Sequence, residues 1–270
     1  MKGIKNRLIV ISIVLLIIVY IFVQVNVTKT KYVKVTTKKY LPVNGIKILQ
    51  ISDFHDKKVF KNYPIKQINK LSPDIVVLTG DLMDEKTKDI SNVLDFIGKL
   101  VKIHPNIYFV NGNHDWRTGK VNELVSKLKD LGIKVLNNRN EILTIRGIKI
   151  NLCGVDDYYT HRSNFKSSLK GIDNSKYTVL LSHSPDIVFT QRNLPIDLIL
   201  SGHTHGGQIR LPFIGAIVSP GQGFFPKYNK GLYEIYNSTM LYIDSGIGTS
   251  KLPIRFLNRS QISLITIAKK

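Results

Sequence analysis

Residues 198–207 read LILSGHTHGG, a short apolar run that ends in a glycine-rich turn carrying two histidines. Because glycine adopts backbone conformations that other residues avoid, the turn can bring His203 and His205 toward one point. An isolated pair of this kind fits surface turn residues as well as it fits metal ligands. The stretch therefore predicts a buried strand followed by a candidate site, and the rest of the chain decides between the two interpretations.

Short runs rich in Ile and Val recur from residue 45 onward and alternate with amphipathic stretches. The alternation is typical of an α/β domain in which buried strands are separated by helices. The expected strands are Ile46–Ile51, Ile75–Leu78, Ile107–Val110, Ile148–Val155, Tyr177–Leu181, Leu198–Leu200, Leu232–Tyr236, Met240–Ile243 and Ile262–Ile267. The expected helices are Ile65–Leu71, Ile90–Ile103 and Lys120–Leu131. The sequence shows no internal repeat and no second helical domain.

Candidate ligands follow five of these expected strands, and they include five of the seven histidines. Taken singly, each fits a turn or a helix cap. Because the carboxyl ends of strands in an α/β sheet converge on one crevice, the groups can meet despite their separation in sequence. The residues are Asp53 and His55, then Asp81 and Asp84, then Asn113, His114 and Asp115, then His183, and finally His203 and His205.

The donor set combines Asp, His and Asn, and the single cysteine, Cys153, excludes a site built from several thiolates. Such donors suit manganese, iron or zinc among the divalent metals. So many candidate ligands are too many for one ion, but they suit two ions if a carboxylate bridges them. The sequence therefore predicts two divalent metal ions, with manganese favoured and iron or zinc as alternatives.

In order and spacing, these motifs resemble those of the calcineurin-like metallophosphoesterase superfamily, from Ile46 to the C-terminus. Within it, Gly206–Pro212 and Gly246–Ser250 are similar to the membrane-anchored bacterial branch that includes the YkuE and YaeI type phosphoesterases. The resemblance implies a four-layer αββα sandwich, in which two mixed β-sheets are flanked by helices. Asn258-Arg259-Ser260-Gln261 departs from the related chains, which commonly carry Pro-Glu at its last two positions. We expect this departure to affect C-terminal packing and not the chemistry.

The resemblance also implies roles for individual residues. One metal would be held by Asp53, His55, Asp81 and His205, and the other by Asp81, Asn113, His183 and His203, with Asp81 as the bridge. Asp84 and Asp115 would orient the ligands, and Arg210 and His161 are weaker candidates for substrate binding.

The implied reaction is hydrolysis of a phosphodiester or pyrophosphate bond by in-line attack of a metal-bound hydroxide, without a covalent intermediate. His114 would donate a proton or hydrogen bond to the phosphate or the leaving oxygen. We expect a lipid, a nucleotide-sugar lipid such as UDP-2,3-diacylglucosamine, or a cell-surface phosphate ester as substrate. A nuclease or cyclic-nucleotide phosphodiesterase on the same centre is the alternative, followed by a non-catalytic phosphate binder. No nucleic-acid partner is expected, because the chain lacks an aromatic and basic platform for bases.

Residues 8–25 are almost wholly apolar, and as a helix they would extend about 27 Å, close to the thickness of a hydrocarbon core. A cleaved signal peptide is the alternative, but no small-residue cleavage site follows Val25. We therefore expect a membrane anchor at 1–25, a basic stalk at 26–44 and the phosphoesterase domain at 45–270. Three basic residues precede the apolar run and five lysines follow it, so the charge cues to orientation disagree. We favour a single-pass cell-membrane protein with an extracytoplasmic catalytic domain.

The net charge of +20 comes from 39 basic against 19 acidic residues. This excess fits a solubilising surface as well as attraction to an anionic membrane or cell wall.

Residues 213–228 contain four aromatic side chains among Gly and Pro: Phe213, Phe224, Phe225 and Tyr228. This segment fits either an aromatic lip that meets an acyl chain or ordinary packing beneath a loop.

Overall fold

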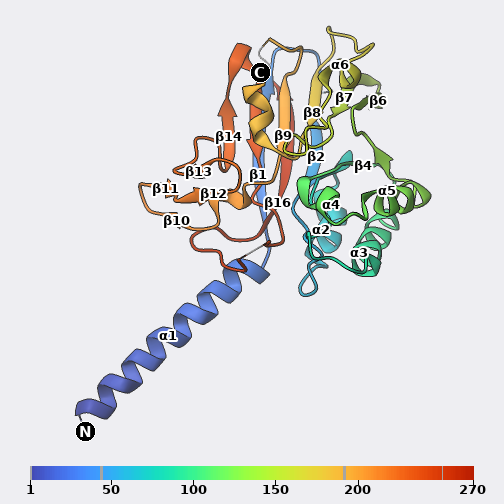
Figure 1. Cartoon of the computed structure of the whole chain (residues 1–270). Helices are drawn as coiled ribbons and strands as arrows, with labels where there is room; N and C mark the ends of the chain where they lie inside the picture. Colours follow the sequence, from blue (N-terminus) through green and yellow to red (C-terminus); the bar gives the residue numbers. More distant parts are fainter. Residues whose placement is uncertain (1, 43–44, 191–192, 251) are drawn as a thin grey trace.

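The computed structural model describes residues 2–42, 45–190, 193–250 and 252–270, and two six-stranded sheets form its centre (Figure 1). Four adjacent strands of the first sheet run parallel to one another, as do four adjacent strands of the second. In spatial order, the first sheet contains β1 (Lys29–Thr37), β16 (Gln261–Lys269), β2 (Ile46–Ile51), β3 (Ile75–Thr79), β4 (Ile107–Val110) and β5 (Lys134–Val135). The second contains β14 (Gly231–Glu234), β15 (Met240–Ile243), β9 (Leu198–Ser201), β8 (Thr178–Leu181), β7 (Ile148–Gly154) and β6 (Arg139–Ile145).

Helices cover the outer faces of both sheets, which confirms the predicted αββα architecture. The first sheet is covered by α2 (Tyr63–Leu71), α3 (Ser91–Val101) and α5 (Val121–Asp130), whose apolar faces join one core with β2, β3 and β4. The layer over the second sheet is thinner, with α6 (Phe165–Ser168) and the 3₁₀ helix η1 (Pro185–Phe189). The remaining short elements are α4 (Asn113–Arg117), η2 (His205–Gly207), η3 (Tyr236–Ser238), and two hairpins, β10 (Arg210–Leu211) with β11 (Gly215–Ala216) and β12 (Val218–Ser219) with β13 (Gly223–Phe224).

The two sheets pack on each other through fully buried aliphatic side chains. Ile48 and Val77 of the first sheet belong to the same core as Leu152, Val179 and Leu200 of the second. Burial of each such side chain stabilises the folded state by roughly 1.5–3 kcal/mol relative to its exposure to water. Burial on both faces explains why these strands appear in the sequence as continuous apolar runs. The packing also places the carboxyl ends of the parallel strands at one edge of the sandwich.

The expected helices and strands agree with the structure within a few residues, but the expected basic stalk at 26–44 is wrong over most of its length. Lys29–Thr37 forms β1, which pairs in parallel with β16, so that Tyr32 lies opposite Leu264. Val35 is buried, whereas Lys31 and Lys34 are exposed on this edge strand. The segment is therefore an edge strand of the first sheet, with exposed lysines on both of its faces. Positions 43 and 44 lie outside the described residues.

The N-terminal helix α1 (Lys2–Asn26) projects away from the sandwich, and the C-terminus lies at the far end of the molecule (Figure 1). By length and composition it is able to cross a membrane. Its apolar side chains are exposed, as at Leu16 with 69% and Ile4 with 66% of the residue surface accessible. A core helix would bury such residues, so the exposed apolar surface favours contact with lipid.

Candidate metal centre

The structure brings all seven sequence-predicted ligands together at the carboxyl edge of the sandwich. Each is less than one tenth exposed. From the first sheet, β2 positions Asp53 and His55, β3 positions Asp81, and the β4–α4 junction positions Asn113. From the second sheet, β8 positions His183, and β9 is followed by His203 and His205.

One group of ligand atoms is formed by Asp53, His55 and His205. The Nε2 atoms of His55 and His205 lie 3.2 Å apart, and Asp53 Oδ1 lies 3.9 Å and 3.8 Å from them. Two nitrogens that each lie about 2.1 Å from a shared ion at a near-tetrahedral angle are roughly 3.4 Å apart. The spacing of these two imidazoles therefore matches that of ligands to one ion.

A second group is formed by Asp81, His183 and His203. His183 Nε2 lies 3.1 Å from Asp81 Oδ2 and 3.2 Å from His203 Nδ1. The amide oxygen of Asn113 faces the same imidazoles, 2.9 Å from His203 Nδ1 and 3.3 Å from His183 Nε2. Rotating that amide would satisfy hydrogen bonds without an ion, but the oxygen-inward orientation is the one that a cation between these acceptors requires. Both orientations place Asn113 in the second group.

Asp81 lies between the two groups. Its Oδ2 atom is 3.1 Å from His183 Nε2 and 3.5 Å from His55 Nε2. Its Oδ1 atom accepts a hydrogen bond of 2.8 Å from the backbone N–H of His114, which fixes the carboxylate plane. A carboxylate in this position is able to contact two cations at once.

Backbone strain accompanies the cluster. Five of the seven ligands have positive φ angles between 47° and 69°, a region that side chains other than glycine rarely adopt. These five residues are Asp53, His55, Asp81, His203 and His205. Residues held in such conformations collect at functional sites, where the surrounding structure stabilises them. The strand ends therefore act as sharp corners that turn consecutive side chains inward.

Two glycines allow the strand ends to approach each other closely. A Cβ atom at Gly112 would overlap the Asp81 carboxylate, and one at Gly202 would overlap Ser52 and the Asp53 carboxylate. The glycines of the sequence motifs thus have a packing role beside the metal ligands.

Residues around the ligands fix their orientation. His183 Nδ1 donates to the Thr79 carbonyl at 2.8 Å, because a carbonyl only accepts, and this leaves the Nε2 lone pair toward the cluster. Asp115 accepts three backbone N–H groups at 2.9 Å, from Asp81, Met83 and Gly112. Asp84 Oδ2 lies 3.6 Å from His55 Nδ1 and 3.7 Å from His114 Nδ1.

The electrostatics of the cluster fit divalent cations. Burial lowers the pKa of His203 and of His205 well below the usual value, so both imidazoles keep lone pairs. Burial favours a protonated Asp81, but the facing His183 outweighs it and lowers the pKa of that carboxyl. Burial also opposes charge on His183, yet Asp81 raises its pKa to about 10. A metal ion beside Asp81 would supply this positive charge in place of a second proton on His183.

A cavity of about 360 Å³ opens onto the cluster, and two of its lining residues escaped the sequence analysis. Arg117 lies on α4, four residues after Asn113, and its half-exposed guanidinium is 3.7 Å from Glu85. The ring of Tyr159 stacks on His203, with 4.7 Å between ring centroids. The helical spacing from Asn113 could have identified Arg117. Tyr159 follows a different strand and carries no such signal.

The two weaker substrate candidates lie outside this cavity. His161 is exposed in a turn, and its backbone N–H donates to the Tyr158 carbonyl. Arg210 donates to the Gly206 carbonyl at 2.9 Å and to Asn229 Oδ1 at 2.6 Å, so it braces the glycine turn after His205.

The segment after residue 208 contains both exposed and buried aromatic side chains. Of the four aromatic side chains in residues 213–228, Phe213, Phe224 and Phe225 are exposed, whereas Tyr228 is buried in the core. Asn258, in the segment that departs from the related chains, donates to the His205 carbonyl at 2.6 Å. This segment therefore contacts the backbone of a candidate ligand, although the two departing positions are Ser260 and Gln261.

Comparison with known proteins agrees with this geometry. A family model described as calcineurin-like phosphoesterase matches residues 46–207. The chain is 32% identical to the Bacillus subtilis metallophosphoesterase YkuE, over 83% of this chain and 79% of YkuE. It is 30% identical to a Danio rerio transmembrane protein with a metallophosphoesterase domain, over 83% of this chain and 54% of that protein. The structure of TT1561 from Thermus thermophilus shares the fold, with a TM-score of 0.52, 13% identity, and coverage of 75% of this chain and 90% of that one.

Proposed function

The chain belongs to the calcineurin-like phosphoesterase family, whose members are metal-dependent phosphoester hydrolases, and from that premise we propose a membrane-anchored, dinuclear enzyme. It cleaves the phosphodiester or pyrophosphate bond of a lipid-linked or cell-surface phosphate ester. The observation that carries the proposal is the pair of ligand groups that meet at Asp81.

We assign the ligands from the measured groups. Asp53, His55 and His205 would hold one ion, and His183, His203 and Asn113 would hold the other. Asp81 would bridge the ions, because its Oδ2 atom faces both groups. Manganese is the favoured metal, since oxygen and imidazole donors without thiolate suit it. When bound, two such ions neutralise charge on a phosphoryl group and lower the pKa of a coordinated water.

His114 is placed to donate to the substrate. Its Nδ1 atom accepts a hydrogen bond of 3.1 Å from the Glu85 backbone N–H, so the proton of the neutral ring lies on Nε2. The ring lines the cavity beside Asp81. An Nε2–H donor at this place stabilises the charge that grows on the leaving oxygen. Arg117, on the same helix, supplies a cation at the cavity rim for the phosphate.

The N-terminal helix anchors this domain as a single-pass segment of the cell membrane. Support comes from the length and exposed apolar surface of α1 and from the Danio rerio relative, which is named as a transmembrane protein. We place the anchor at residues 1–25 and begin the catalytic domain at β1, with the domain on the extracytoplasmic side. Digestion of the domain by external protease in intact cells is the expected result. A protected domain would contradict this orientation.

Hydrolysis assays on the full chain in lipid nanodiscs test the proposed activity. We expect turnover of bis-p-nitrophenyl phosphate with Mn²⁺ and none in excess EDTA. Inactivity with Mn²⁺, Fe²⁺ and Zn²⁺ alike would contradict the proposal. Release of UMP from a UDP-linked lipid, compared with nicking of plasmid DNA, then separates a lipid-linked substrate from a nucleic acid.

A further inference from the structure

The last two turns of α1 are fixed to the catalytic domain. The Gln24 carbonyl accepts from the Ser260 N–H at 2.8 Å, and Tyr20 Oη accepts from the Leu257 N–H at 3.1 Å. Lys57 Nζ donates to the Val25 and Ile247 carbonyls, each at 3.0 Å. A cation at the carboxyl end of a helix is favoured by the helix dipole. The helix therefore meets the domain at a set angle.

Ring contacts reinforce this junction. Tyr20 packs edge-on against Phe256 with centroids 5.5 Å apart, and Phe22 packs likewise against Phe60 at 5.9 Å. The loop that carries Phe60 thus lies beside the end of a helix that continues into the membrane. Phe60 is still 59% exposed, and Val59 is 53% exposed. With α1 spanning a bilayer as proposed, these side chains would lie near its surface, where aromatic and aliphatic groups enter the headgroup region.

A cavity of about 510 Å³ runs between α1 and the domain. One wall is a single face of α1, formed by Ile18, Ile21, Phe22 and Val25, which recur at helical spacing. Ile18 lies about 10 Å deeper along the helix than Val25, at ~1.5 Å per residue. The cavity therefore begins within the apolar part of the anchor and extends toward the domain.

The inner end of this cavity adjoins the candidate metal centre. The side chain of His55 is fully buried, so its backbone is the part that lines the cavity, while its Nε2 atom faces the metal ligands. Thr249 lines the α1 cavity, and the next residue, Ser250, lines the cavity over the metal centre. One short segment of chain thus separates the two spaces. Lys58, with its side chain 65% exposed, lies at the rim of the cavity and forms an ion pair of 2.7 Å with Asp56.

The geometry points to an acyl-chain site in the α1 cavity that holds the lipid tail of the substrate while its phosphate crosses Ser250 to the metal centre. This inference rests on the proposed function and names the substrate class as a lipid-linked phosphate ester drawn from the same membrane. A second helix is a poor occupant, because one helical turn about 10 Å across already fills about 400 Å³. An extended hydrocarbon chain fits the narrow volume and continues into the bilayer beside α1.

The test compares decyl and ethyl p-nitrophenyl phosphate diesters, below their micellar concentrations, with the full chain in nanodiscs. We expect kcat/KM to increase by up to about fourfold per added methylene that the site buries. Ile21→Trp fills the cavity and should lower the decyl-to-ethyl ratio of kcat/KM at least tenfold. Val59→Trp narrows the cavity from the opposite wall and should also lower the decyl-to-ethyl ratio of kcat/KM. Val19→Trp, on the exposed side of α1, is the matched control and should keep the wild-type ratio.

The ratio is measured on one sample, so an unfolded fraction lowers both rates equally and does not change it. Partition of the decyl ester into the nanodisc is also shared by all variants. An unchanged ratio in both Ile21→Trp and Val59→Trp would overturn the acyl-chain site while the proposed activity stands. A wild-type chain that hydrolyses neither ester would contradict the proposed function itself. A phospholipid that co-purifies with the wild type and is lost in Ile21→Trp without a change in the ratio would make the cavity a resident-lipid site and overturn the inference.

Discussion

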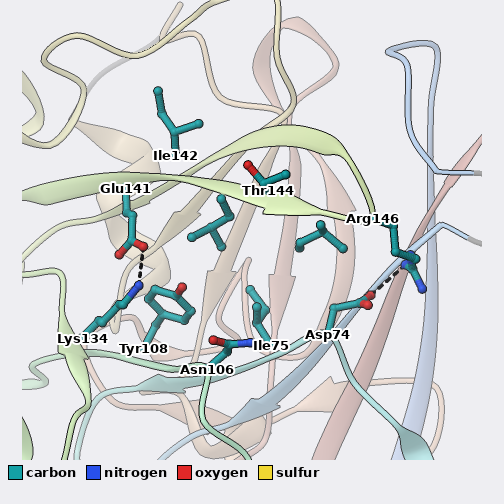
Figure 2. Close-up of a pocket in the computed structure, with 11 residues that line it drawn as sticks. Asp74, Ile75, Asn106, Tyr108, Lys134, Glu141, Ile142, Thr144 and Arg146 are labelled. Atoms are coloured by element: carbon teal, nitrogen blue, oxygen red, sulfur yellow. Dashed lines mark hydrogen bonds and ion pairs between the residues drawn. The ribbon is translucent and has the colours of Figure 1, made fainter.

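Two cavities of similar size occur in the sandwich, one of about 360 Å³ at the carboxyl ends of the central strands and one of about 380 Å³ beside their amino ends. Figure 2 shows the second, in which Lys134 pairs with Glu141 and Arg146 pairs with Asp74. The first instead gathers carboxylate and imidazole atoms that face one another. The two cavities share their size, so size does not identify the functional one. The arrangement of the charged groups does identify it. Paired charges of opposite sign stabilise the protein, whereas carboxylate and imidazole acceptors that face one another require a cation between them.

Removal of Asp81 has the largest expected effect. Asp81→Ala should lower turnover at least about a thousandfold and reduce bound metal, since both ligand groups lose their shared oxygen. Activity assays and metal analysis of the purified chain measure the two effects. The matched control is Glu141→Ala in the other cavity, which should leave turnover within twofold and change the free energy of unfolding by less than about 1 kcal/mol. Equal losses of turnover in Asp81→Ala and Glu141→Ala would contradict the functional difference between the two cavities.

Removal of His114 should separate chemistry from metal binding. His114→Ala is expected to lower kcat by about a hundredfold or more, which is typical of a lost general acid. Its metal content should stay at the wild-type level, because the ring is turned toward Glu85 and the cavity. Loss of metal in this variant, or normal turnover, would refute the assignment.

Addition of a single methyl group should disturb the candidate metal centre without removing any candidate ligand. Gly112→Ala places a Cβ against the Asp81 carboxylate, and we expect turnover to fall about tenfold or more with weaker metal affinity. Gly98→Ala is the matched control, because a Cβ at that helical position meets open space. The Gly98→Ala chain should remain fully active. If the Gly112→Ala chain is as active as the Gly98→Ala chain, close packing against Asp81 is not required for turnover.

Arg117 should have the smallest effect of the four. Its guanidinium is half-exposed at the cavity rim, so Arg117→Ala should raise KM about tenfold, the cost of roughly one charge-assisted hydrogen bond, with little change in kcat. Initial rates over a range of substrate concentrations separate the two constants. A fall in kcat at constant KM would place Arg117 in the chemical step instead.

Sequence alone predicted the parts of this molecule that depend on local pattern. The buried parallel strands appear as continuous runs of Ile and Val, and the candidate ligands follow such runs, so their common location at the strand ends was predictable. The edge strand Lys29–Thr37 was missed because three of its nine residues are lysines, and only its pairing with β16 shows that it belongs to the sheet. Tyr159 and the role of Arg210 as a brace depend on tertiary contacts between segments far apart in sequence.

The seven predicted ligands now have a common location, but their division between two ions is still a proposal. Anomalous X-ray diffraction from crystals of the Mn²⁺-loaded chain tests it most directly. The account predicts two peaks on the order of 3.5–4 Å apart, one among Asp53, His55 and His205 and one among His183, His203 and Asn113, with Asp81 touching both. A single peak, or two peaks that do not share Asp81, would contradict the dinuclear centre.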